Sequence, residues 1–268
     1  MVENTEAAVL YETNSDLVIE NLNLAAPGPK EVFVQMGAAG VCHSDVHVIS
    51  GQAQQLMPCV LGHEGAGLVT SIGDDVSRVS VGDHVILSWL PYCENCYQCI
   101  RGKTHLCNAF QTPVGNGTLL DGSCRFSNKQ GPIRQLGSLG CWSENVVVSE
   151  ECCVPINRSI PFEIAALLGC AVTTGVGAVL NRAKVQKGET VVVIGAGGVG
   201  LSVVMAAKLQ GASQIICIDK NRSMRNLAIE LGATDFLVSS QDDDIFKKLI
   251  AVSYTHLRAH ETPEQRGC

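Results

Sequence analysis

Short runs of alternating hydrophobic and polar residues dominate the first part of the chain. A period near two along such runs is typical of strands with one buried face. Strands are predicted at residues 7–11, 17–20, 31–36, 67–73, 79–83 and 84–87. Glycine and proline turns separate them, and glycines at the corners allow the sharp bends of a closed sheet. The pattern therefore predicts a small β-barrel-like domain.

The hydrophobic pattern changes beyond residue 160. Residues 162–180 are apolar at helical spacing, and residues 190–194 form a continuous β-branched run that is typical of a buried parallel strand. Further strands are predicted at 215–218 and 235–238, with helices at 201–210, 222–231 and 242 to about 250. This alternation predicts an α/β Rossmann domain with a parallel sheet.

Three segments are expected along the chain. Residues 1–160 form the β-barrel-like domain, and residues 161–250 hold the first half of a doubly wound Rossmann domain, which normally has two halves. Residues 251–268 lack an apolar strand run and resemble a translated cloning adapter, so we expect a non-native tail there. Between 110 and 157 the chain is rich in glycine, and periodicity predicts only a strand at 144–148.

Composition and charge narrow the class of protein. The 268 residues are 46% hydrophobic, which is ordinary for a globular protein with a core. A net charge of -7 without a Lys/Arg cluster disfavours nucleic acid and membrane surfaces as partners. The N-terminus lacks the pattern of an export signal, so the 13 cysteines predict metal ligands or free thiols rather than disulfides. A cytoplasmic location is expected.

A glycine-rich loop directly follows the predicted strand at 190–194. The first glycine of such a loop makes a tight turn, the second admits a pyrophosphate, and the third packs the helix on the strand. Asp219 ends the next strand, where an acid can bind both ribose hydroxyls of NAD. Arg222 and Arg225 lie close by in the sequence, so NADP is not excluded as the cofactor. The alternative reading is a glycine turn that packs without a ligand. The predicted cofactor-binding residues are Gly195, Gly197, Gly198, Val199, Gly200 and Asp219.

Four cysteines lie close together in a second motif, at Cys93, Cys96, Cys99 and Cys107. Thiolates at this spacing can surround one tetrahedral ion as a closed structural zinc site. An iron–sulfur run typically places its fourth cysteine three residues after the third, with proline next, whereas Asn108 follows Cys107 here. We therefore predict structural zinc, with an iron–sulfur cluster or free thiols as alternatives.

A second metal site is predicted around Cys42 and His63. A thiol and an imidazole, each beside a carboxylate, suit a soft divalent metal such as zinc, which keeps one position open when it is catalytic. The candidate third ligand is Cys170, in an apolar run far along the chain. The alternative is that both cysteines are small buried residues and His63 is a core histidine.

These motifs together resemble the zinc-containing medium-chain alcohol dehydrogenases. Gly62-His63-Glu64-x-x-Gly67-x5-Gly73-x-x-Val76 fits the zinc signature of that family at every fixed place. The four-cysteine motif, Cys170 and the glycine loop follow in the family's order. Residues 119–126, Leu-Leu-Asp-Gly-Ser-Cys-Arg-Phe, are similar to the long-lobed alcohol and glutathione-dependent formaldehyde dehydrogenases. The resemblance covers about residues 5–250 and implies a GroES-like catalytic domain before the Rossmann domain.

The resemblance also implies roles for individual residues. Cys42, His63 and Cys170 would hold a catalytic zinc, since two cysteines and one histidine are the known ligand set of alcohol dehydrogenase. Trp89 matches a substrate-pocket position, where its bulk favours small or slim alcohols. Near the metal, Asp45 would orient His63, and Glu64 would lie close by without being a standing ligand. Ser44 would take the substrate proton and His47 would relay it. His43 would contact the pyrophosphate and Thr174 the nicotinamide.

The implied activity is the interconversion of a small alcohol and its aldehyde or ketone, with two zinc ions per chain and NAD. Zinc lowers the pKa of the alcohol, Ser44 and His47 remove its proton, and a hydride passes to NAD. Two alternatives stay open: a formaldehyde dehydrogenase that acts on a thiol adduct, and a non-catalytic zinc-binding fragment, because only half of the Rossmann domain is predicted. The full-length form is expected to be a homo-oligomer.

Overall fold

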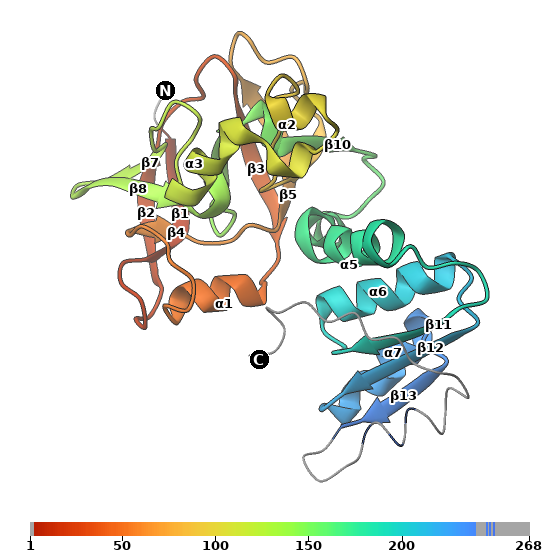
Figure 1. Cartoon of the computed structure of the whole chain (residues 1–268). Coiled ribbons are helices and arrows are strands. Elements are labelled where there is room, and N and C mark those ends of the chain that lie inside the picture. The colour runs from red at the N-terminus through yellow and green to blue at the C-terminus, as the bar shows by residue number, and fades with distance from the viewer. Residues whose placement is uncertain (1–2, 240–244, 246, 248, 250–268) are drawn as a thin grey trace. The chain divides into compact units, whose positions relative to one another are not determined.

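The computed structural model describes residues 3–239 together with residues 245, 247 and 249 (Figure 1). The chain divides into two compact units, Met1–Ala171 and Val172–Cys268. The predicted boundary at residue 160 lies earlier, because Ala165 and Ala166 still pack against Ala66 and Ile86 of the first unit. The predicted helix from 242 to about 250 lies largely outside the described residues, and the tail at 251–268 lies wholly outside them.

The first unit contains a closed barrel and a five-stranded sheet, as the alternating pattern predicts. In spatial order, the barrel strands are β1 (Glu3–Leu10), β2 (Val18–Leu24), β7 (Phe126–Asn128), β8 (Gly131–Gln135) and β4 (Cys59–Val60). The sheet runs in the order β10 (Cys153–Ile156), β6 (His84–Leu87), β5 (Gly65–Ile72), β3 (Glu31–Ala39) and β9 (Asn145–Ser149). Neighbouring strands of this sheet are antiparallel throughout.

Two parts of the first unit differ from the sequence-based expectation. Residues 79–83 form a turn instead of a strand, because the Asp83 carboxylate accepts the Ser80 N–H at 2.9 Å and Gly82 has a φ of +93°. Helix α3 (Asn108–Asn116) and strands β7 and β8 lie where periodicity predicted little. The remaining helices are α1 (His43–Ile49), α2 (Tyr97–Ile100), η1 (Thr104–Leu106), η2 (Leu136–Ser138), η3 (Glu150–Cys152) and α4 (Phe162–Leu167).

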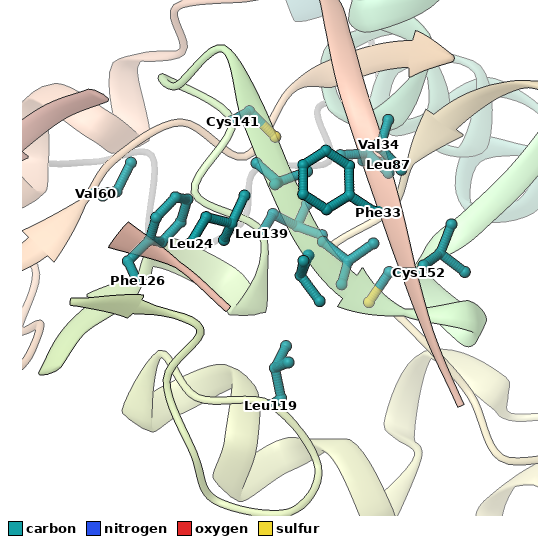
Figure 2. Packing of buried hydrophobic residues seen from close by; sticks show 14 of the residues in the cluster. Leu24, Phe33, Val34, Val60, Leu87, Leu119, Phe126, Leu139, Cys141 and Cys152 are labelled. Carbon is teal, nitrogen blue, oxygen red and sulfur yellow. The ribbon is translucent and has the colours of Figure 1, made fainter. Parts of the chain in front are cut away.

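The core of the first unit lies between the barrel and the sheet (Figure 2). Alternate residues of each strand point inward, so Leu22 and Leu24 of β2 are fully buried while the intervening Asn23 is exposed. Phe126 and Leu139 join them from segments far along the chain. Each such side chain contributes about 1.5–3 kcal/mol on burial, which holds the loops between the strands in fixed positions.

The Glu150 carboxylate joins η3 to the turn at residues 77–78. It is 3% exposed, and its Oε2 accepts the N–H groups of Ser77 at 2.7 Å and Arg78 at 2.9 Å. Burial alone would raise the pKa of Glu150, but these hydrogen bonds hold it below the ordinary value. The stabilisation is therefore complete above the unfolded-state pKa of about 4.3 and is lost as pH falls through the lower folded-state pKa.

Replacing Glu150 with glutamine is expected to lower the free energy of unfolding by about 1–3 kcal/mol at pH 7, because two backbone N–H donors lose a charged, buried acceptor. The difference from the wild-type protein should shrink below about pH 4, where the native carboxylate also takes up a proton. Urea denaturation of both proteins across this range measures it. A difference that stays constant down to pH 3 would show that the charge of Glu150 has no such role.

The second unit is a three-stranded parallel sheet with helices. The strand order is β11 (Thr190–Ile194), β12 (Gln214–Asp219) and β13 (Asp235–Val238). Its helices are α5 (Thr173–Gly177), η5 (Ala178–Ala183), α6 (Gly198–Leu209), η6 (Arg222–Met224) and α7 (Arg225–Leu231). Val193, Val204, Ile215, Ala228 and Phe236 form its core. This arrangement confirms the predicted part of a Rossmann domain.

One helical segment of the described chain, Phe162–Ala183, is long and apolar enough to cross a membrane by length and composition. It comprises α4, η4 (Leu168–Val172), α5 and η5. Ala165 and Ala166 pack in the core of the first unit, and Val179 packs with Val185 and Ala206 in the second. The segment therefore contributes a few buried residues to the core of each unit, and 22% of it is buried.

Candidate functional site

Cys42 lies immediately before α1 and caps that helix. Its backbone is extended, with φ of -101° and ψ of 153°, and the Asp45 N–H donates to its carbonyl oxygen at 3.0 Å. The Asp45 Oδ2 in turn accepts the Cys42 N–H at 3.0 Å. The bond from the Cys42 N–H to the Asp45 carboxylate belongs to a capping box, which fixes the position of Cys42 at the end of the strand–helix connection.

The Asp45 carboxylate connects the two predicted metal-binding segments. Asp45 is fully buried, and its Oδ1 accepts the Gly62 N–H at 3.2 Å and lies 3.1 Å from the His63 Nδ1. A histidine that donates from Nδ1 keeps Nε2 available for a metal. Burial lowers the pKa of His63, but hydrogen bonds with Asp45 and Cys42 outweigh this effect and raise it to about 10. Asp45 is therefore in contact with His63, and its orienting role, which the resemblance implies, stays a prediction.

Four side chains converge beside this carboxylate. The ligand atoms of Cys42, His63, Glu64 and Cys170 all lie within 4.8 Å of one another. Hydrogen bonds from Cys170 and His63 lower the pKa of the Cys42 thiol to about 3, and a thiolate is the form that binds metal. The donors therefore fit zinc, with Cys42, Cys170 and His63 as soft and borderline ligands.

Glu64 lies in this cluster, near the predicted metal position. It is 2% exposed, and burial and the neighbouring Cys42 thiolate raise the pKa of its carboxyl group. A Cβ at Gly40 would lie 2.2 Å from the Glu64 Oε2, so only glycine leaves room for this carboxylate. The Glu64 carboxylate therefore lies beside the metal position.

One residue that braces the ligand-bearing segments, Trp142, was missed by the sequence reasoning. The Trp142 indole N–H donates to the Gly40 carbonyl oxygen at 2.9 Å, and the Trp142 backbone N–H donates to the Leu61 carbonyl oxygen at 3.0 Å. Gly62 has a φ of +86°, and a Cβ there would lie 2.4 Å from the Trp142 ring. Trp142 thus packs directly on the loop that carries His63, but no local motif around residue 142 indicates it.

The residues with predicted roles in proton transfer lie on α1. The Ser44 hydroxyl and backbone N–H both hydrogen-bond to the Cys42 sulfur. The rings of His43 and His47 contact edge to face, with centroids 4.7 Å apart. Ser44 and His43 are exposed, and His47 is half-buried. Solvent can therefore reach this end of α1, as a proton relay would require.

The predicted substrate-pocket residue Trp89 lies next to the metal-binding histidine. Its ring and that of His63 meet edge to face, with centroids 6.2 Å apart. Gly137 packs on both: a Cβ at this glycine would lie 3.2 Å from the Trp89 Cβ and 3.8 Å from the His63 Cβ. Gly137 also has a φ of +62°, so a larger residue there would be strained and would displace Trp89.

The four cysteines of the second motif form a separate cluster around α2 and η1. Their sulfur atoms all lie within 4.8 Å of one another; the Cys107 sulfur is 3.5 Å from that of Cys93 and 3.9 Å from that of Cys96. A tetrahedron with Zn–S bonds of about 2.3 Å has S–S edges of about 3.8 Å. The N–H groups of Cys99 and Asn108 lower the pKa of Cys96 to about 6, so the cluster fits a closed zinc site.

The predicted cofactor loop connects β11 to α6 in the second unit. Gly195 has a φ of +97°, and a Cβ at Gly200 would lie 1.8 Å from the Gly195 carbonyl oxygen. A Cβ at Gly197 would meet no described heavy atom within 4 Å, which leaves the backbone open to a ligand. The three glycines therefore have the turn, approach and packing geometry of a dinucleotide loop.

Thr174 is exposed on α5, also in the second unit. It precedes Gly175, where an added Cβ would lie 2.5 Å from Ser202 and 2.7 Å from the Val199 carbonyl oxygen. The helix that carries Thr174 thus packs closely on the first turn of α6, next to the glycine loop. Its predicted contact with the nicotinamide stays a prediction.

Comparison with known proteins identifies the family of this chain. The model of the alcohol dehydrogenase GroES-like domain matches residues 28–158. The S-(hydroxymethyl)glutathione dehydrogenase of Saccharomyces cerevisiae is 44% identical over 253 residues, which span 92% of this chain and 66% of the yeast protein. The protein of the same name from Paracoccus denitrificans is 38% identical, with 94% of this chain and 68% of that protein covered. The chain thus spans about two thirds of the length of these relatives.

Solved structures show the same relationship. The alcohol dehydrogenase zinc-binding domain protein from Burkholderia ambifaria matches with a TM-score of 0.87 and 33% identity, over 94% of this chain and 68% of that one. Benzyl alcohol dehydrogenase from Acinetobacter calcoaceticus gives a TM-score of 0.85, also at 33% identity, over the same shares of the two chains. The chain therefore belongs to the zinc-dependent medium-chain alcohol dehydrogenases, in the branch that includes the S-(hydroxymethyl)glutathione dehydrogenases.

Proposed function

We propose that the protein to which this chain belongs is a zinc-dependent dehydrogenase that oxidises an alcohol with NAD. The observation that carries the proposal is the convergence of Cys42, His63 and Cys170 within 4.8 Å, with the Asp45 carboxylate orienting the histidine. Two thiols and an imidazole form the ligand set of a catalytic zinc that keeps one position open for substrate. A closed structural site, by contrast, has four protein ligands and no open position.

The chain's own residues account for proton removal and binding. When bound, zinc supplies a Lewis acid that lowers the pKa of the alcohol, and NAD supplies the hydride acceptor. Ser44 accepts the proton of the substrate hydroxyl, and His47 passes it toward solvent. The glycine loop binds the pyrophosphate at the start of α6, where the helix dipole favours an anion. Trp89 limits the width of the substrate beside His63.

A second, finer candidate is the oxidation of S-(hydroxymethyl)glutathione, the thiol adduct of formaldehyde. The relatives support it, since proteins called S-(hydroxymethyl)glutathione dehydrogenase match this chain at 38–44% identity. Residues 119–126 also resemble this branch. Both candidates use the same zinc ligands and NAD, and they differ only in the alcohol.

An assay of NADH formation separates the candidates. We expect the zinc-loaded protein to produce NADH from ethanol or longer primary alcohols, or from formaldehyde only when glutathione is added. Ser44→Ala should lower turnover about 10²-fold, because the variant lacks the hydroxyl that takes the proton. Zinc binding without NADH formation from any of these substrates would contradict the proposed activity and favour a non-catalytic zinc-binding protein.

A further inference from the structure

The Asp219 carboxylate contacts the two loops that follow β11 and β12. Its Oδ2 accepts the Ala196 N–H at 2.6 Å, and its Oδ1 accepts the Asn221 N–H at 2.7 Å. Ala196 belongs to the glycine loop, and Asn221 begins the turn before η6. Because β11 and β12 are parallel and adjacent, both loops leave the sheet at the same edge. One half-buried side chain thus joins them.

The bond to Ala196 restrains the middle of the glycine loop. The backbone itself holds the beginning of the loop, where the Gly195 N–H donates to the Ile218 carbonyl at 2.8 Å. Glycines lose more conformational freedom on folding than other residues, and Gly197 next to Ala196 lies beside open space. A hydrogen bond to a charged acceptor between these glycines therefore limits the conformations available to the loop.

We propose that Asp219 is a positioning residue for the pyrophosphate-binding loop, in addition to its contact with the ribose of the cofactor. This inference rests on the proposed binding of NAD. A carboxylate oxygen accepts more than one hydrogen bond, so Asp219 can hold the Ala196 and Asn221 N–H groups and still accept the ribose hydroxyls. Its removal should then weaken binding of the pyrophosphate as well as of the ribose, because the loop is no longer held in its binding conformation.

Two ligands separate this role from a contact with ribose alone. ADP carries a pyrophosphate and both ribose hydroxyls, whereas 2′,3′-dideoxy-ADP carries the pyrophosphate without the hydroxyls. If Asp219 binds only ribose, Asp219→Ala lowers the affinity for ADP and leaves the affinity for dideoxy-ADP unchanged. If Asp219 also holds the loop, the variant should lower the affinity for dideoxy-ADP about 10-fold, which is the effect of losing one charged hydrogen bond. Isothermal titration calorimetry on the full chain measures both affinities.

Hydrogen exchange tests the same inference without a ligand. The Ala196 amide should exchange at least about 10-fold faster in Asp219→Ala than in the wild-type protein, because its acceptor is gone. Asp235→Ala is the matched control: Asp235 lies at the start of β13 and accepts hydrogen bonds from the side chains of Gln214 and Thr234. Its replacement should leave the Ala196 amide and the dideoxy-ADP affinity unchanged.

A second variant covers the case in which Asp219→Ala does not fold. Asp219→Asn preserves the shape of the side chain and one oxygen acceptor, so one of the two loops keeps its bond. We expect Asp219→Asn to lower the affinity for dideoxy-ADP less than Asp219→Ala does, but more than Asp235→Ala does. Unchanged dideoxy-ADP binding and unchanged exchange in both variants would overturn the positioning role. Failure of the wild-type protein to bind ADP would instead contradict the proposed NAD site.

Discussion

Replacing Cys96 with serine is expected to reduce the zinc content from two ions per chain to one and to unfold the segment from Cys93 to Cys107. A serine hydroxyl stays protonated at neutral pH and does not replace a thiolate ligand. Metal binding at such sites contributes on the order of 10 kcal/mol to local folding, and the apolar cluster around the four cysteines contains little besides Phe110, Tyr92 and Val114. This is the largest effect that we expect from a single substitution.

Zinc released by a denaturant and quantified with a chromogenic chelator measures this stoichiometry, and limited proteolysis detects the exposed segment. Cys124→Ser is the matched control, because Cys124 is a half-buried free thiol outside both clusters. It should leave two zinc ions per chain and an intact segment. A Cys96→Ser protein that still binds two zinc ions would contradict the assignment of a structural site.

Replacing Asp45 with alanine should have the second largest effect. The fully buried carboxylate accepts hydrogen bonds from Cys42 and Gly62 and pairs with His63. Removing one partner of a buried ion pair costs about 3–5 kcal/mol. Loss of the group that orients a metal-bound histidine also lowers metal affinity about 10–100-fold. Both effects act on the site formed by Cys42, His63 and Cys170 and should leave the four-cysteine site occupied.

Thermal denaturation with and without added zinc, together with competition against a chelator of known affinity, measures these two effects. Asp45→Asn keeps one oxygen acceptor and should lose less stability than alanine. The exposed Asp16 offers a control for the loss of a negative charge, since Asp16→Ala should change the stability by less than about 0.5 kcal/mol. An Asp45→Ala protein with wild-type zinc affinity would exclude the orienting role.

Local patterns determined much of this protein from the sequence alone. The strands at 190–194 and 235–238 have the bounds that the sequence predicts, because a parallel strand is read as a continuous apolar run. The predicted burial of 190–194 is met only at Val193, and Ile194 is 77% exposed. The four-cysteine cluster and the glycine loop are also local: their residues lie within fifteen and six positions of the chain, so their geometry depends on spacing that the sequence itself displays.

Contacts between distant segments were decided only by the tertiary structure. Hydrophobic periodicity shows which face of a strand is buried, but it does not show which loop will pack on that face. The bracing of Gly40 and Gly62 by Trp142, the packing of Gly137 on Trp89, and the Asp219 bond to Ala196 all belong to this class. The sequence could name Cys42, His63 and Cys170 through a family signature. The short distances between the ligand atoms of these three residues depend on the packing of a barrel, a helix and a sheet around one core.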